Sequence, residues 1–184
     1  ALAYDENSPE KDLSISTTPN DGFMPKCVVV EDEYNWENDT PLNYPLKDCI
    51  IYETHVRGLT KSLTAKVKHH GTYRGVVEMI PYFKSLGITS LELLPVQEFD
   101  SSERFRRNPI TGERLSNYWG YSPIAFFAPE SSYAFDEGID HDSYCPSHPV
   151  KEFKYMVEKN SIDIPKNICA GLSDEDFEIG RAHV

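Results

Sequence analysis

Apolar residues in the middle of the chain follow a strand pattern, then a helix pattern, and then a strand pattern again. Residues 48–56 form an apolar, β-branched run that is typical of a buried strand. Thr72 can cap a following helix, whose apolar positions have helical spacing: Val76, Met79, Ile80, Phe83 and Leu86. Pro81 predicts either a kink or a second helix with proline in its first turn, and Gly87 predicts the helix end. Residues 88–96 form the second apolar run.

This order of elements predicts a βαβ unit. Its two strands should be parallel and joined by a right-handed crossover. Buried parallel strands need helices over their faces, so the predicted fold class is α/β. Ligand sites in such folds lie beyond the carboxyl ends of the strands, and we therefore look for functional residues there.

A long segment, roughly residues 97–145, follows the second predicted strand and is rich in aromatic residues. We expect a loop here, and loops of this length in compact domains usually serve a function. A further helix is predicted to begin near Pro149. Its expected inner face carries Val150, Phe153 and Val157, and its expected outer face carries Lys151, Glu152 and Lys154.

The first 45 residues read as an irregular linker, because prolines interrupt them repeatedly. The apolar stretch 27–30 predicts one edge strand. Tyr34 and Trp36 are expected to fix the segment onto a neighbouring surface. Nothing in this part of the sequence indicates catalysis.

Composition and charge exclude several classes of function. The chain has 184 residues with 30 acidic and 18 basic side chains, a formal charge of −12, which argues against a nucleic-acid partner. No apolar run reaches the length of a membrane span, so no membrane partner is expected. The four cysteines are far apart, which predicts neither a disulfide framework nor a metal site, and reduced thiols favour a cytoplasmic protein.

Several sequence blocks occur in a fixed order along the middle of the chain. They are IYETHVRGLT at 51–60, GTY at 71–73, LELLPVQEF at 91–99, NPITGE at 108–113, NYWGYSP at 117–123 and FFAP at 126–129. From about residue 20 to about residue 158 the chain resembles the isoamylase and bacterial glycogen debranching branch of the α-amylase superfamily, glycoside hydrolase family 13. Residues 23–30 are similar to the segment that joins this family's N-terminal β-sandwich to its barrel.

The resemblance implies a (β/α)8 TIM barrel that hydrolyses α-1,6-glucosidic branch linkages of glycogen-type glucans with retention of configuration. It divides the chain into a linker from a missing β-sandwich domain (1–45), the start of the barrel with its first two strands and helices (46–159), and an aberrant tail (160–184). Retention requires two carboxyl groups about 5 Å apart. In the family these follow the fourth and fifth strands, with a further Asp after the seventh. We therefore assign no catalytic residue in this chain and expect it to be inactive alone.

The candidate substrate-binding residues lie in the NYWGYSP block. The resemblance implies that Tyr121 forms a stacking platform under the sugar at the cleavage point, with Trp119 and Tyr118 beside it. The apolar face of a pyranose packs well on an aromatic ring, so an α-glucan is the expected partner and no cofactor or metal is needed. The alternative is that these rings fill a core beneath the loop.

Glu53 and His55 come at the end of the first predicted strand, and their alternation suggests a shared face. They could form an acid/base pair or bind a metal. A buried polar pair that bonds neighbouring strands is the interpretation we favour, because buried polar groups must be paired.

The sequence leaves two other functions open. One is an α-1,4-acting or branch-making relative of the same superfamily, which would share the first two strands. The other is a non-catalytic carbohydrate-binding fragment that uses the aromatic residues alone. The NYWGYSP and LLPVQEF blocks together favour debranching, and the βαβ order is unlike a β-sandwich binding module.

Residues 160–184 depart from the family pattern, because no strand of the expected kind follows the last predicted helix. The ending EIGRAHV at 178–184 is also the translation of GAGATCGGAAGAGCACACGTC, which resembles a common sequencing-library adapter. We hypothesise that 178–184 are read-through and that 160–177 are frame-shifted or chimeric. The alternative is an authentic, divergent C-terminus, and the genomic reading frame distinguishes the two.

Overall fold

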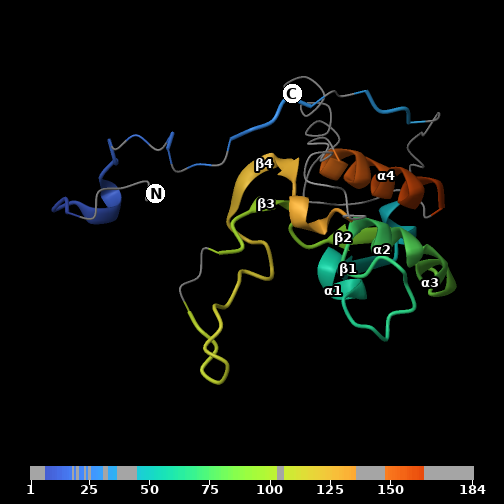
Figure 1. Cartoon of the computed structure of the whole chain (residues 1–184). Helices are drawn as coiled ribbons and strands as arrows, with labels where there is room; N and C mark the ends of the chain where they lie inside the picture. The colour runs from blue at the N-terminus through green and yellow to red at the C-terminus, as the bar shows by residue number, and fades with distance from the viewer. Residues whose placement is uncertain are drawn as a thin grey trace.

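The computed structural model in Figure 1 describes most of the central part of the chain. The described residues are 7–17, 19, 21–22, 24, 26–30, 33–36, 45–102, 106–135 and 148–163. The strands are β1 (Ile51–Thr54), β2 (Ser90–Leu93), β3 (Gln97–Phe99) and β4 (Pro123–Pro129). The α-helices are α1 (Val56–Thr60), α2 (Tyr73–Glu78), α3 (Ile80–Ser85) and α4 (His148–Asp163), with short 3-10 helices at Lys11–Leu13, Leu46–Asp48 and Ser131–Tyr133.

The predicted βαβ unit is confirmed. Strands β1 and β2 are parallel neighbours, with Ile51 opposite Ser90 and Thr54 opposite Leu93. The α/β class is therefore correct for this unit, although both strands are shorter than predicted. Strand β1 ends at Thr54 because His55 already caps the short helix α1, its side chain accepting a hydrogen bond from the Gly58 amide.

The connection between these strands contains the short helix α1 and then two consecutive helices, α2 and α3, as the position of Pro81 suggested. The Thr72 side chain caps α2 by accepting from the Gly75 amide, and Pro81 lies in the first turn of α3. Helix α3 ends in a Schellman motif, in which the Gly87 amide donates to the Lys84 carbonyl and the Ile88 amide to the Phe83 carbonyl. Gly87 adopts a φ of 71°, the left-handed conformation that this motif requires.

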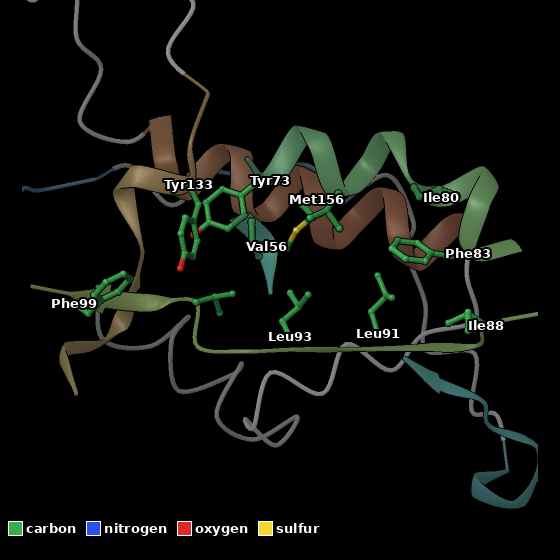
Figure 2. Packing of buried hydrophobic residues seen from close by; sticks show 12 residues of the cluster. Val56, Tyr73, Ile80, Phe83, Ile88, Leu91, Leu93, Phe99, Tyr133 and Met156 are labelled. Carbon is green, nitrogen blue, oxygen red and sulfur yellow. The ribbon is translucent and has the colours of Figure 1, made fainter. Parts of the chain in front are cut away.

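The hydrophobic core lies between the helices and β2. Figure 2 shows Leu91 and Leu93 pointing from β2 toward the helices, with Met156 of α4 lying among them. Tyr73, Val76 and Phe83 of α2 and α3, together with Met156, are fully buried. Complete burial of a side chain of this kind stabilises the fold by roughly 1.5–3 kcal/mol. This core fixes the strand ends, and hence the loops that follow them.

Helix α4 occurs where it was predicted, but one residue of its expected outer face is buried. Glu152 is only 4% exposed, and it accepts a hydrogen bond of 2.8 Å from the Phe135 amide. The Arg74 guanidinium lies 2.6 Å from its other oxygen. The assignment of Glu152 to the outer face was therefore wrong: this carboxylate is buried against an ion-pair partner on α2 and a backbone amide after β4, neither of which the spacing within α4 reveals.

The helix also continues to Asp163, three residues beyond the predicted start of the aberrant tail at residue 160. Residues 164–184, including the adapter-like ending, lie outside the described residues. The origin of the tail stays a hypothesis. Within the described part of the chain, no helix is long and apolar enough to cross a membrane.

The segment expected to be an irregular loop contains a second sheet. Strands β3 and β4 pair in antiparallel fashion, with register shifts on either side of Glu98. Between them, residues 106–115 form a hairpin, whose strands meet at Arg107 and Arg114. The expectation of a long loop without regular structure was wrong here, because β3 supplies a local partner for the apolar run at 123–129.

The N-terminal segment contacts the body through one of the two aromatic residues singled out from the sequence. The Tyr34 hydroxyl donates to the Glu158 carboxylate of α4, and the Lys154 ammonium lies 6.0 Å from the centre of the Tyr34 ring. Trp36 packs against Tyr34. The predicted edge strand at 27–30 is wrong: these residues form no strand, and Val29 is fully exposed.

Candidate functional site

The aromatic segment 117–122 lies at the carboxyl ends of both parallel strands. His55, directly after β1, places its Nε2 atom 2.9 Å from the Tyr118 carbonyl oxygen. Gly120 lies close to the Pro95 carbonyl, two residues after β2, since a Cβ atom on this glycine would come within 3.3 Å of that oxygen. The candidate residues Tyr118, Trp119 and Tyr121 are therefore at the end of the sheet where α/β folds bind ligands.

The loop owes its shape to Asn117 and Gly120. The Asn117 side chain accepts from the Gly120 amide at 3.3 Å and donates to the Tyr121 carbonyl at 2.7 Å. Gly120 has a φ of 79°, and a Cβ there would lie only 3.1 Å from the Phe99 ring. Glycine is therefore required twice, for its backbone conformation and for its lack of a side chain. The sequence predicted the aromatic residues but missed Asn117, although it opens the same block.

The three aromatic side chains are exposed rather than packed into a core. Trp119 and Tyr121 are each 57% exposed, and Tyr118 is 41% exposed. The Tyr118 ring stacks on His55 at 4.9 Å with an angle of 13°, and the Trp119 ring meets Tyr118 edge-on at 6.2 Å. This arrangement does not correspond to the alternative in which the rings fill a core. It leaves aromatic faces available to an apolar ligand surface.

His55 is buried beneath this loop, and its hydrogen bonds fix its protonation state. Its Nδ1 atom accepts from the Gly58 amide at 3.0 Å, so the hydrogen of the neutral ring is on Nε2, which faces the Tyr118 carbonyl. Burial lowers the pKa of His55, and the Arg57 charge lowers it further, while the bond to Tyr118 acts in the opposite direction. The ring is therefore neutral near pH 7.

Glu53 does not join His55. It is exposed on β1, whereas His55 is 6% exposed and begins the helix α1. The predicted buried polar pair is wrong, and the structure brings together no Glu53–His55 acid/base or metal pair. The alternation of a strand could not extend to residue 55, because the backbone turns into α1 at that point.

A polar cluster that the sequence did not reveal surrounds the same end of the sheet. The Tyr133 hydroxyl lies 3.1 Å from His55 Nε2, and the Arg57 guanidinium is 5.1 Å from the centre of the Tyr133 ring. Arg57 also donates to the carbonyl and hydroxyl of Ser132. Burial raises the pKa of the Tyr133 hydroxyl well above its ordinary value, so it stays protonated. The only signal for Arg57 was its place in the IYETHVRGLT block.

Two carboxylates stabilise the turn that carries Tyr133. Glu130 is buried and accepts from the amides of Phe99 and Ser132. Glu98 accepts from the Ser131 amide at 2.8 Å. Burial, together with the nearby Glu130 charge, raises the pKa of Glu98, while the bonds to Ser131 oppose the shift. Both side chains act here as acceptors for backbone amides at the start of the 3-10 helix.

No metal centre is evident in the part of the chain that the structure describes, where no three His, Cys, Asp or Glu side chains are grouped to hold an ion. Two of the cysteines, Cys27 and Cys49, form no disulfide.

The sequence comparison finds a clear relative. Isoamylase 1, chloroplastic, from Arabidopsis thaliana is 37% identical over 169 residues, which cover 88% of this chain and 21% of that protein. The matched part of the chain is longer than residues 20–158, so the similarity extends beyond the segment identified from the motifs. The chain spans about a fifth of the length of the curated relative that it matches. No family model matches the chain.

Solved structures give the same result. A pullulanase from Paenibacillus barengoltzii, in complex with maltohexaose and α-cyclodextrin, is 26% identical with a TM-score of 0.53, over 70% of this chain and 21% of that one. Pullulanase type I from Bacillus subtilis str. 168, complexed with maltose, is 28% identical with a TM-score of 0.55, over 77% and 20% of the two chains. The resemblance to debranching enzymes that the motifs indicated is thus confirmed. The cytoplasmic location stays a prediction, and the plant relative is named chloroplastic.

Proposed function

The chain is a homologue of the debranching glycosidases isoamylase and pullulanase, and from this premise we propose that it is the opening part of a domain that hydrolyses α-1,6-glucosidic branch linkages in glycogen or related α-glucans. The observation that carries the proposal is the 37% identity with isoamylase 1 over 88% of the chain. The position of the aromatic loop at the carboxyl ends of β1 and β2 supports it.

The proposed architecture is a (β/α)8 barrel of which β1 and β2 are the first two strands. Helices α1, α2 and α3 lie in the connection between them, and α4, which comes after the β3–β4 ribbon, is proposed to be the second barrel helix. Among the described residues β1 and β2 form a two-stranded sheet, so each has a free edge. In a closed barrel both edges would be paired.

In this proposal Tyr121 is the platform on which a glucose ring stacks, with Trp119 and Tyr118 extending the surface. The C–H face of a pyranose and an exposed aromatic ring bury apolar area against each other, and the Tyr hydroxyl can bond a sugar hydroxyl. The pullulanase structures that hold maltohexaose, α-cyclodextrin and maltose agree with an α-glucan as the ligand.

The chemical step is proposed to be retaining and to use carboxylates outside this chain. A retaining glycosidase needs a nucleophilic carboxylate and an acid/base about 5 Å apart. The carboxylates of Glu98 and Glu130 accept hydrogen bonds from backbone amides and hold the fold. The polypeptide described here would bind and orient substrate but not cleave it, and it is proposed to be inactive alone.

The test uses the longer protein that contains this segment. It should release linear chains from glycogen and cleave pullulan, measured as reducing ends and by iodine staining, whereas amylose should be a poor substrate. Tyr121→Ala should lower kcat/KM by about ten- to a hundred-fold, since burying an aromatic side chain against the sugar is worth roughly 1.5–3 kcal/mol. Tyr155→Ala, which removes a half-exposed ring on α4, is the control and should leave kcat/KM unchanged.

The outcomes separate the alternatives. Cleavage of amylose in preference to pullulan would indicate an α-1,4-acting relative, and new branch points would indicate a branching enzyme. Binding without turnover by the longer protein would favour a carbohydrate-binding fragment. Unchanged turnover and affinity in Tyr121→Ala would remove Tyr121 from the site.

A further inference from the structure

We propose that His55 is a positioning residue: its imidazole holds the 117–122 loop on the end of β1 by donating a hydrogen bond to the Tyr118 carbonyl. The inference rests on the proposed function in one respect only, namely that the loop it positions binds the glucan. It concerns a side chain that does not itself face the substrate.

His55 has three hydrogen-bond partners, because the Tyr133 hydroxyl oxygen also lies 3.1 Å from Nε2. The directions of the bonds to Gly58 and Tyr118 follow from the groups they join. The Gly58 amide can only donate, so Nδ1, at 3.0 Å, must present its lone pair. A neutral imidazole then carries its hydrogen on Nε2, and the Tyr118 carbonyl, at 2.9 Å, can only accept. One side chain therefore caps α1 through one nitrogen and anchors the aromatic loop through the other.

The ring of His55 is enclosed by the groups that it would position. It stacks on the Tyr118 ring, meets the Trp119 ring at 6.0 Å and 86°, and meets the Tyr133 ring at 5.6 Å and 74°. The titratable and charged groups around it are Arg57 on α1, Tyr118 in the loop and Tyr133 after β4. Displacement of the imidazole would therefore disturb helix α1, the 117–122 loop and the turn that carries Tyr133. Of these three segments, the loop has the exposed aromatic rings.

The His55 bond joins the loop to β1, whereas the other hydrogen bonds described for the loop lie within it or lead to the β3 side. The Asn117 side chain bonds Gly120 and Tyr121 within the loop, and the Asn117 amide donates to the Ser101 carbonyl. A shift of about 1 Å in a binding platform is enough to reduce catalytic efficiency strongly.

Two substitutions separate the two nitrogens of His55. In His55→Gln the amide nitrogen can take the place of Nε2 and donate to Tyr118, but the acceptor for Gly58 is lost. In His55→Asn the amide oxygen can take the place of Nδ1 and cap α1, but the donor to Tyr118 is lost. The proposal predicts that glutamine preserves the loop and that asparagine does not.

The first readout needs no substrate. Hydrogen exchange followed by mass spectrometry on the 184-residue chain should show faster exchange in 117–122 for His55→Asn, with the hairpin 106–115 and strand β2 unchanged. His55→Gln should match the original chain in all three peptides. Equal exchange in the loop of both variants, or general loss of protection in β2, would overturn the positioning role.

The second readout is the kinetics of the longer protein. His55→Asn should raise KM for pullulan about three- to ten-fold, which is the loss expected from one hydrogen bond, with a smaller change in kcat. His55→Gln should stay within about two-fold of the original. A protein that shows the exchange pattern but cleaves no α-glucan would refute the proposed function alone, whereas cleavage with no difference between the two variants would refute the role of His55 alone.

Discussion

The core under the helices and the loop at the strand ends use the same kinds of side chain in opposite environments. Tyr73 of α2 and Phe83 of α3 are completely buried in the core. In the loop at the strand ends, Trp119 and Tyr121 are each more than half exposed. Buried rings stabilise the fold through the area they remove from water, while exposed rings contribute nothing comparable. The two regions therefore separate stability from recognition.

The contrast extends to the β3–β4 ribbon next to the loop. Phe126 and Phe127 are 65% and 64% exposed on β4, and successive residues of a strand point to opposite faces. The ribbon therefore presents aromatic surface on both sides. The rings of the helical core are buried, whereas those of the ribbon and of the loop stay exposed.

The largest expected effect tests this separation directly. Phe83→Ala should reduce the free energy of unfolding by about 3–5 kcal/mol, because it removes a fully buried ring and leaves a cavity. Phe127→Ala, the same change at an exposed position, should alter it by less than about 0.5 kcal/mol. Urea denaturation followed by circular dichroism measures both values. Similar losses in the two variants would show that the ribbon is part of the core.

A second substitution tests how rigidly the loop is held. Gly120→Ala should cost roughly 2 kcal/mol, because Gly120 has a positive φ and a Cβ there would press on the Phe99 ring. Gly112→Ala is the matched control: Gly112 also has a positive φ, but nothing lies within 4 Å of its Cβ position. If Gly120→Ala lowers the free energy of unfolding no more than Gly112→Ala does, the Phe99 ring and the loop can move to accommodate the added methyl group.

Local rules in the sequence were sufficient for the helical core. Thr72, Pro81 and Gly87 each have one strong conformational preference, and together they predicted the start, the break and the end of the two helices. The parallel pairing of the two strands followed from their order. These features depend on residues close together in the chain, so a single sequence reveals them.

The features that were mispredicted depend on partners distant in sequence. Glu152 is buried where it forms an ion pair with Arg74 and accepts a hydrogen bond from the Phe135 amide. The spacing of residues within α4 does not predict either partner. The pairing of β3 with β4 joins segments more than twenty residues apart. In the site, the motif blocks predicted Tyr118, Trp119 and Tyr121, whereas the buried support from His55 and Tyr133 became visible only in three dimensions.

A third, smaller effect is expected on the core side. Gly87→Ala should destabilise the fold by about 1 kcal/mol, since Gly87 closes α3 in the left-handed conformation while its Cβ position is open. Gly87→Asn should lose less, because asparagine tolerates this conformation better. The midpoints of urea unfolding give both values. A stabilised alanine variant would contradict the Schellman motif at this helix end.

The smallest effect is a pH dependence that connects the two regions through His55. Folding lowers the pKa of this side chain below its ordinary value of 6.5, mainly by burial. At a pH between the lowered pKa of the folded protein and 6.5, the unfolded chain therefore binds more protons than the folded one. The contribution of neutral His55 to stability is therefore complete above about pH 6.5 and is lost as the pH falls through the lowered pKa. Protonation places a hydrogen on Nδ1, and this hydrogen would face the N–H group of Gly58.

Glutamine at position 55 does not titrate. The difference in unfolding free energy between His55→Gln and the original chain should therefore be constant above about pH 7 and should become smaller on acidification. Urea unfolding at a series of pH values measures this difference, and a difference independent of pH would show that His55 is not buried as the neutral ring that supports the loop.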